Sequence, residues 1–172
     1  MADESGFELN LARLARELAS ALKPQNIRIV FAESCTGGMM AAAMTGVPGI
    51  SANFCGSAVT YRESTKTQWL SISEKDLDQH TAESEFTTHS MAKAVLEKTP
   101  EADFSVAITG HLGPGVEAQI DGLIFVSVLY RGNDSLQANK SKHQLTGSTR
   151  RQRQAEAACF ALERLLNSVQ DF

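Results

Sequence analysis

The chain has 172 residues, of which 42% are hydrophobic and 21% are charged, a length and composition typical of one globular domain. Its formal net charge of -4 argues against nonspecific binding to nucleic acid or to an anionic membrane, because such binding requires a basic surface. The three cysteines and four histidines show neither disulfide nor zinc-ligand spacing, so we expect a reducing compartment and no structural metal.

The sequence shows no targeting or membrane-spanning segment. Residues 1–4 are acidic and no basic segment precedes an apolar one, so we expect no signal peptide. No apolar run approaches the roughly 20 residues that a transmembrane helix requires. We therefore expect a cytoplasmic protein that does not associate with membranes.

Hydrophobic periodicity predicts helices and strands that alternate along the chain. Leucines recur at helical spacing from Leu11 to Leu22, and Pro24 ends that pattern. In chain order, the predicted elements are a helix up to Leu22, a strand over 27–32, a helix over 36–45, a strand over 54–61, helices over 64–70 and 84–96, strands over 104–108 and 123–130, a polar edge strand over 137–145 and a helix over 148–169. This alternation predicts an α/β fold, namely a layered α/β/α sandwich with a mixed sheet. Because no linker divides the chain, we expect a single domain over residues 1–172.

The run Ala32-Glu33-Ser34-Cys35-Thr36-Gly37-Gly38 lies where the first predicted strand gives way to a helix. Ligands of open α/β sheets bind beyond the carboxyl ends of strands, and a helix N-terminus can stabilise a phosphate or a developing oxyanion. Ser34 is therefore a candidate nucleophile. Ser34 or Thr36 acting only as the helix N-cap explains the same run equally well. Cys35 is a second possible nucleophile, although it also fits a small buried filler.

A serine nucleophile needs a base, because a free hydroxyl is a poor nucleophile. The candidates are His111 and Lys66, which follows Tyr61 at the end of the second predicted strand. A lysine acts as a base only when neutral, and its reference pKa of about 10.4 disfavours that form at pH 7 unless burial lowers it. A solvated surface position explains Lys66 more simply, and an exposed loop position explains His111.

Two further segments could bind an anion. The run Thr109-Gly110-His111-Leu112-Gly113-Pro114-Gly115 follows the third predicted strand, and its glycines could expose backbone N–H groups to an anion, although a plain tight loop is the alternative. Arg150, Arg151 and Arg153 begin the last predicted helix, where the helix dipole repels cations unless an anionic ligand is bound. A solvated face is the alternative for these arginines.

Together these motifs resemble the C-terminal domain of the CinA (competence-damage) family, which includes stand-alone nicotinamide-nucleotide amidases. The resemblance extends from about Leu11 to Leu166. The segments that carry it are the Ser34 run, Val47-Pro48-Gly49, Val59-Thr60-Tyr61 with Lys66, Thr109-Gly110 with Gly113-Pro114-Gly115, Gly122 and Arg150. The resemblance implies an amidase in pyridine-nucleotide recycling, which deamidates nicotinamide mononucleotide to nicotinic acid mononucleotide and ammonia without a metal or other cofactor. We also expect a homo-oligomer that binds a small-molecule nucleotide substrate and neither nucleic acid nor a membrane.

The resemblance also implies roles for individual residues. By position, Ser34 corresponds to the nucleophile, Lys66 to its base, Tyr61 to an orienting or relaying group, Thr109 to a hydroxyl that contacts substrate or oxyanion, and Arg150 to a phosphate ligand. The further substrate-binding positions that it implies are Thr36, Gly37, Gly38, Gly110, Gly113 and Gly115.

Three departures from the family pattern flank the expected substrate site. Segment 116–121 is shorter than the usual connection and differs in character, His111 and Leu112 replace small or aliphatic residues, and Gln154 stands where a second arginine is expected. Two alternatives therefore stay open. One is a related amidase that acts on a different small carboxamide, and the other is a catalytically inactive nucleotide-binding paralogue.

Overall fold

The computed structural model describes residues 4–132 and 135–172, with the backbone alone for residues 4 and 5. Five strands form one sheet in the order β2-β1-β3-β4-β5. Their bounds are β1 Ile29–Glu33, β2 Phe54–Val59, β3 Phe104–Gly110, β4 Leu123–Arg131 and β5 Leu136–Gln144. β1 pairs in parallel with β2 and β3, whereas the β3–β4 and β4–β5 pairs are antiparallel. The sheet is therefore mixed, and the polar strand β5 lies at its edge, as predicted.

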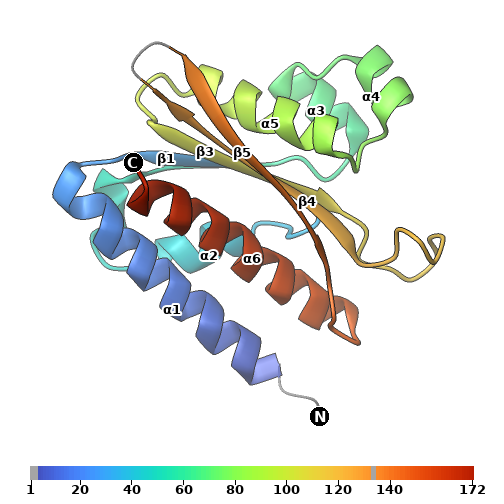
Figure 1. Cartoon of the computed structure of the whole chain (residues 1–172), viewed down its shortest axis with the longest axis horizontal. Coiled ribbons are helices and arrows are strands. Elements are labelled where there is room, and N and C mark those ends of the chain that lie inside the picture. The colour runs from blue at the N-terminus through green and yellow to red at the C-terminus, as the bar shows by residue number, and fades with distance from the viewer. Residues whose placement is uncertain (1–3, 133–134) are drawn as a thin grey trace.

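Helices cover both faces of the sheet (Figure 1). The bounds of the helices on one face are α1 Glu4–Leu22, α2 Met39–Thr45 and α6 Arg150–Gln170, and those on the other are α3 Glu63–Leu70, α4 Glu74–His80 and α5 Glu85–Lys98. Because successive strand residues point to opposite faces, Phe31 packs in the core with α1 and α6, and its neighbour Val30 packs in the core with α5. The predicted α/β/α sandwich is confirmed. No helix in the described ranges is long and apolar enough to cross a membrane.

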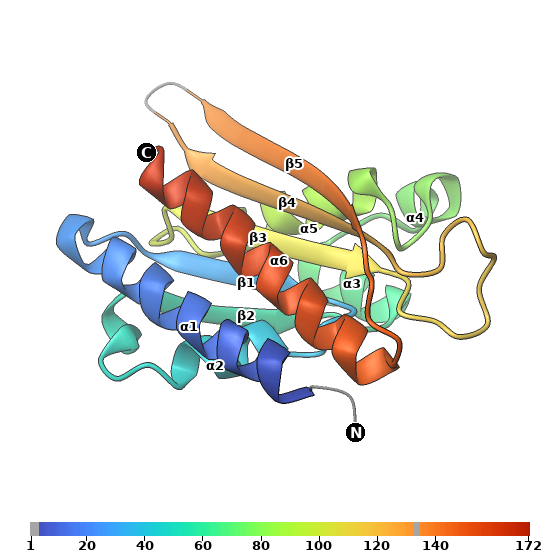
Figure 2. The same ribbon diagram turned by 60° about the horizontal axis from the view of Figure 1, so that its bottom comes forward.

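The parallel strands bring three loops to one edge of the sheet. Ser34 follows β1, Tyr61 lies just beyond β2, and loop 111–122 follows β3 and projects away from the sheet (Figure 2). Backbone hydrogen bonds connect the strand ends, because Ser34 N donates to Ile108 O at 3.2 Å and Thr60 N donates to Glu33 O at 2.8 Å. This edge therefore carries most of the residues that the sequence marks as candidates.

Most predicted bounds shift by one or two residues, β2 for example ending at Val59 rather than residue 61, and three differences have a clear physical reason or concern a whole element. Helix α2 begins at Met39 rather than near residue 36, because Gly37 and Gly38 adopt the left-handed conformation at φ 62° and 93°. Strand β3 continues through Thr109 and Gly110. Helix α4 was not predicted, because Leu77 is its only buried residue and its sequence has no apolar stripe.

Candidate active site

Glu33, the last residue of β1, fixes the turn that carries Ser34. Its carboxylate is fully buried. It accepts hydrogen bonds from the N–H groups of Gly38 (3.1 Å), Met40 (3.2 Å) and Ala41 (3.0 Å) and from the hydroxyls of Thr36 (2.8 Å) and Ser57 (3.0 Å). The N–H groups at the start of α2, considered above as an anion site, are therefore satisfied by the chain itself. The N-cap of α2 is Gly38, and neither Ser34 nor Thr36 takes that position.

Ser34 lies in contact with Lys66, which α3 contributes from the other side of the turn. The Lys66 Nζ donates to Ser34 Oγ at 3.1 Å and to the Thr60 carbonyl oxygen at 3.0 Å. The Lys66 side chain is fully buried, so the interpretation of Lys66 as a solvated surface charge is wrong. A serine hydroxyl and an amine at this distance form the arrangement that an activated nucleophile requires.

Burial sets the protonation of the groups around Ser34. It lowers the pKa of the Lys66 amine below its usual 10.5, because the ammonium form loses its hydration, while the charges of Glu83 and Glu63 oppose this change. Burial also raises the pKa of the Cys35 thiol to about 12. Cys35 is therefore a protonated, unreactive thiol at neutral pH, and Ser34 is the better candidate for the nucleophile.

A pocket of about 220 Å³ opens beside Ser34 at this edge of the sheet. Its walls come from the strand ends, from loop 111–122, from the connection between α4 and α5, and from the start of α6. The residues that line it are Ser34, Cys35, Tyr61, Glu83, residues 110–114, Val116 and Arg150. The pocket therefore brings the Ser34 hydroxyl together with the carboxylate of Glu83, the imidazole of His111 and the guanidinium of Arg150.

Arg150, the first residue of α6, connects two walls of this pocket. Its guanidinium donates to the Gly113 carbonyl oxygen at 2.6 Å and to the Tyr61 hydroxyl at 3.0 Å. Arg151 pairs instead with Glu8 at 3.1 Å, and Arg153 pairs with Asp121 at 2.7 Å. Among the described residues, no carboxylate forms an ion pair with Arg150. Of the three arginines, Arg150 is thus the one whose charge faces the pocket without a counter-ion.

The structure does not bring all of the predicted site residues into the pocket. Ser34, Tyr61, Gly110, Gly113 and Arg150 line it, and Lys66 lies directly behind Ser34. The Tyr61 hydroxyl contacts Arg150, and no hydrogen bond joins it to Ser34 or Lys66 within the described chain. The predicted residues that lie outside the lining are Thr36, Gly37 and Gly38 in the Glu33 turn, Gly115 in the exposed loop, and Thr109, whose buried hydroxyl shares a 2.8 Å hydrogen bond with Thr88.

Glu83 is a pocket residue that the sequence reasoning missed. It lies in the connection between α4 and α5, just before Ser84, the N-cap of α5. It is distant in sequence from any strand end and belongs to no recognised motif. The one sequence signal near Glu83 is Ser84, the N-cap of α5. The start of α5 packs against the end of β3 through the contact between Thr88 and Thr109.

Two of the departures from the family pattern have structural roles here. Gln154 donates from Nε2 to the Thr36 carbonyl oxygen at 3.0 Å, and this bond ties α6 to the Ser34 turn. Arg153 donates to Asp121 at 2.7 Å and to the Gly147 carbonyl oxygen at 2.9 Å, which anchors loop 111–122. The unusual loop is therefore held at the pocket by contacts with α6.

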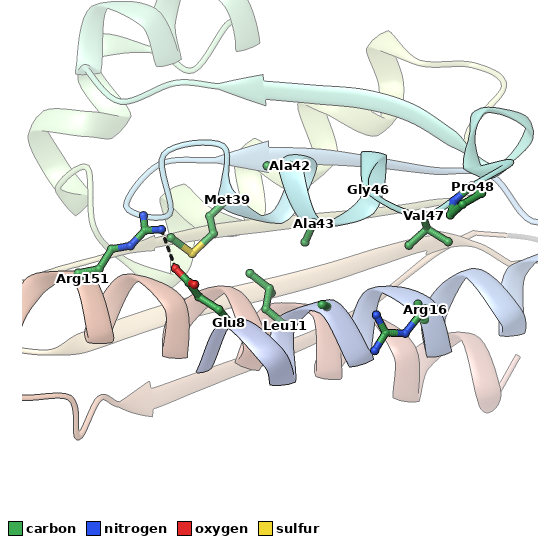
Figure 3. Close-up of a pocket in the computed structure, with 11 residues that line it drawn as sticks. Glu8, Leu11, Arg16, Met39, Ala42, Ala43, Gly46, Val47, Pro48 and Arg151 are labelled. Carbon is green, nitrogen blue, oxygen red and sulfur yellow. Dashed lines mark hydrogen bonds and ion pairs between the residues drawn. The ribbon is translucent and has the colours of Figure 1, made fainter. Parts of the chain in front are cut away.

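A larger groove of about 510 Å³ lies between α1 and α2 (Figure 3). Its walls are mostly apolar, with Leu11, Met39 and Val47 among them, and the Glu8–Arg151 ion pair lies at one end. No serine, cysteine or histidine lines it. Within the described ranges, no group of three or more His, Cys, Asp or Glu side chains is placed to hold a metal ion. The candidate chemistry therefore lies in the Ser34 pocket.

The fold and the site define an α/β/α protein with a buried serine–lysine pair at the carboxyl edge of its parallel strands. The family model of the CinA C-terminal domain matches residues 11–169, and the chain belongs to this family. The resemblance that the motifs carry is confirmed.

Similar proteins include both short and long relatives. The nicotinamide-nucleotide amidohydrolase PncC of Enterobacter agglomerans is 35% identical over 161 residues, which cover 92% of this chain and 95% of that protein. A CinA-like protein of Prochlorococcus marinus (strain MIT 9312) is 41% identical over 124 residues, which cover 71% of this chain and 29% of that protein. The chain thus matches less than a third of the length of such relatives.

Solved structures show the same fold. The crystal structure of competence damage-inducible protein A (ComA) from Klebsiella pneumoniae subsp. pneumoniae MGH 78578 has a TM-score of 0.86 and 27% identity, and the match covers 94% of this chain and 98% of that one. The competence/damage inducible protein CihA from Agrobacterium tumefaciens has a TM-score of 0.84 and 31% identity, with coverage of 92% and 96%.

Proposed function

We propose that the chain is an amidohydrolase that converts nicotinamide mononucleotide to nicotinic acid mononucleotide and ammonia. The observation that carries this proposal is the 3.1 Å contact between the buried Lys66 Nζ and Ser34 Oγ at the wall of a pocket that also holds Arg150. The name of the Enterobacter agglomerans relative, which is similar over almost its full length, supports the choice of substrate.

The proposed reaction begins when the neutral Lys66 amine accepts the Ser34 proton as Oγ attacks the carboxamide carbon. Lys66 then returns the proton to the amide nitrogen, the C–N bond breaks, and ammonia leaves an ester on Ser34. Water attacks this ester with Lys66 as its base, and the acid and free Ser34 are released. One amide and one water thus give one acid and one ammonia.

The geometry suits both ends of the substrate. A general base acts within about 2.6–3.2 Å of the proton donor, and the Lys66–Ser34 distance of 3.1 Å meets this requirement. Burial favours the neutral amine that the first step needs. The guanidinium of Arg150 is the side chain best suited to a phosphate, and its present partners, a hydroxyl and a carbonyl, are neutral groups that a phosphate can displace.

The direct test is to incubate the purified chain with nicotinamide mononucleotide and to measure ammonia and nicotinic acid mononucleotide. We expect turnover by the wild type and a loss in kcat of about 10³-fold or more for Ser34→Ala. Ser64→Ala is the matched control, because Ser64 is an exposed serine on α3.

Three results would change the proposal. Equal turnover by wild type and Ser34→Ala would remove Ser34 from the mechanism. Turnover of other carboxamides alone would favour the related amidase. Binding of the mononucleotide without any ammonia release would favour the inactive paralogue.

A further inference from the structure

Glu83 is a pocket carboxylate that the proposed chemistry does not use. It lines the same pocket as Ser34 and is half-buried there. Among the described residues, its carboxylate forms no ion pair and accepts no hydrogen bond. A carboxylate in a confined site without a partner is well placed to interact with a ligand, because only the ligand or water can satisfy it.

The backbone around Glu83 is held firmly. Thr87 Oγ1 donates to the Thr81 carbonyl oxygen at 2.6 Å, and Ser84 Oγ accepts from Thr87 N at 3.1 Å. Thr88 Oγ1 contacts both the Ser84 carbonyl oxygen at 2.6 Å and the end of β3. Because side chains on a fixed backbone can position a ligand accurately, Glu83 fits a binding role better than a mobile surface acid would.

The two charged side chains of the pocket, Glu83 and Arg150, act on different groups. Glu83 acts electrostatically on the Lys66 amine and the Cys35 thiol, which adjoin Ser34. Arg150 contacts Tyr61 and Gly113 instead. Nicotinamide mononucleotide carries its positive charge on the ring that bears the carboxamide and its negative charge on the phosphate. A carboxamide at Ser34 therefore brings the ring cation towards Glu83 and leaves the phosphate for Arg150.

In the empty pocket, the negative charge of Glu83 disfavours the neutral form of Lys66 that the proposed reaction needs. Lys66 must be neutral to accept the Ser34 proton, yet the charge of Glu83, like that of Glu63, favours the ammonium form and opposes the lowering of the Lys66 pKa by burial. A positive charge on the bound substrate would offset the charge of Glu83. The carboxylate thus helps the reaction only when the substrate is a cation.

We infer that Glu83 selects carboxamides attached to a positively charged ring, such as a pyridinium, over neutral analogues. This inference rests on the proposed function, since it assumes that the carboxamide reacts at Ser34. It adds to that function the residue that recognises the positive charge of the ring.

The test compares two substrates that differ in ring charge. These are nicotinamide mononucleotide and its reduced dihydronicotinamide form, whose ring is neutral while the carboxamide and phosphate are the same. The ratio of their kcat/KM values is measured in the wild type, in Glu83→Gln and in Glu63→Gln. The difference in intrinsic reactivity between the two rings cancels when these ratios are compared. For Glu83→Gln we expect the ratio to fall about tenfold, which corresponds to about 1.4 kcal/mol.

Glu63→Gln separates recognition of the ring from a change at the base. Glu63 also acts on the charge of Lys66, but it does not line the pocket. We expect its substitution to leave the ratio unchanged. An equal fall for both variants would show that Glu83 acts only through Lys66, and this would overturn the inference. An unchanged ratio for Glu83→Gln with ammonia release retained would overturn it as well, and the proposed function would stand.

Binding measurements keep the inference testable if turnover of either substrate is absent. Titration calorimetry on Ser34→Ala and on the Ser34→Ala/Glu83→Gln double variant gives Kd values for the oxidised and reduced mononucleotides. A preference of Ser34→Ala for the oxidised form that the double variant loses supports the inference. Equal preference in both variants overturns it. Absence of ammonia release from the wild type overturns the proposed function separately.

Discussion

Replacing Lys66 with methionine tests the proposed base while nearly preserving the shape of a buried side chain. The substitution removes the amine that lies 3.1 Å from Ser34 Oγ. General-base catalysis contributes about 10²–10⁴-fold, so kcat for nicotinamide mononucleotide should fall by that factor. This corresponds to an increase of about 3–5.5 kcal/mol in the activation free energy. The assay is ammonia release at saturating substrate, with thermal melting of both proteins to confirm that they fold.

Lys93→Met is the control for this experiment. Lys93 is an exposed lysine on α5 that pairs with Glu97 at 3.8 Å, a surface interaction worth about 0.3–0.5 kcal/mol. We expect its kcat to equal that of the wild type. A folded Lys66→Met protein with kcat within about tenfold of the wild type would refute Lys66 as the base, since the general-base contribution begins at about 10²-fold.

Three further predictions follow from the contacts described above. Arg150→Met should raise KM for nicotinamide mononucleotide about 10–100-fold, because a hydrogen bond to a charged group is worth about 1.5–3 kcal/mol. The KM for nicotinamide riboside, which lacks the phosphate, should not change. An equal loss on both substrates would contradict a phosphate-binding role for Arg150. Glu33→Gln should lower the free energy of unfolding in urea by about 2–4 kcal/mol, because the glutamine amide cannot replace a buried carboxylate that accepts five hydrogen bonds. A loss below about 0.5 kcal/mol would contradict this reasoning. Burial lowers the pKa of Lys66 in the folded protein, so the unfolded chain binds more protons between that lowered pKa and 10.5. The free energy of unfolding of the wild type should therefore rise with pH across this window relative to that of Lys66→Met. The opposite slope in denaturant melts would refute the shift.

Most of the fold could be predicted because its buried faces leave clear patterns in the sequence. The leucines of α1 and the apolar run of β1 mark their own burial, and the polar alternation of β5 marks a sheet edge. Helix α4 leaves no such pattern, since it packs through Leu77 alone. Its one local signal is Ser73, whose side chain accepts from Asp76 N as the N-cap.

The candidate site was harder to predict, because its groups come together only in the folded chain. Ser34 and Lys66 are 32 positions apart, and Lys66 and Leu70 are the only buried residues of the polar helix α3. Nothing in that segment distinguishes a buried lysine from a solvated one. The same limit applies to Thr109, whose hydroxyl contacts Thr88 behind the pocket, and to Glu83, whose place in the pocket depends on how α5 packs against β3.

Glu33 shows a different limit. The sequence identifies the Ser34 run as a motif, but it does not reveal that the Glu33 carboxylate caps α2. The glycines after Ser34 suggest an open helix N-terminus, and the structure fills that position with the carboxylate that precedes Ser34. A buried acid that caps the following helix cannot be distinguished by spacing from an exposed one. The Glu33 carboxylate also accepts a hydrogen bond from the hydroxyl of Ser57 on β2, and this contact exists only in the folded chain.

Loop 111–122 is closed at its own base, since His111 N donates to Leu123 O at 2.9 Å and Gly122 N donates to His111 O at 2.8 Å. These hydrogen bonds hold its two ends together, and the Ser34–Lys66 pair is built from other segments. Insertions or exchanges inside the loop can therefore alter one wall of the pocket while the reacting groups keep their positions. The loop is the natural graft site for changing which ligands the pocket admits, and libraries confined to residues 114–120 are expected to retain folding.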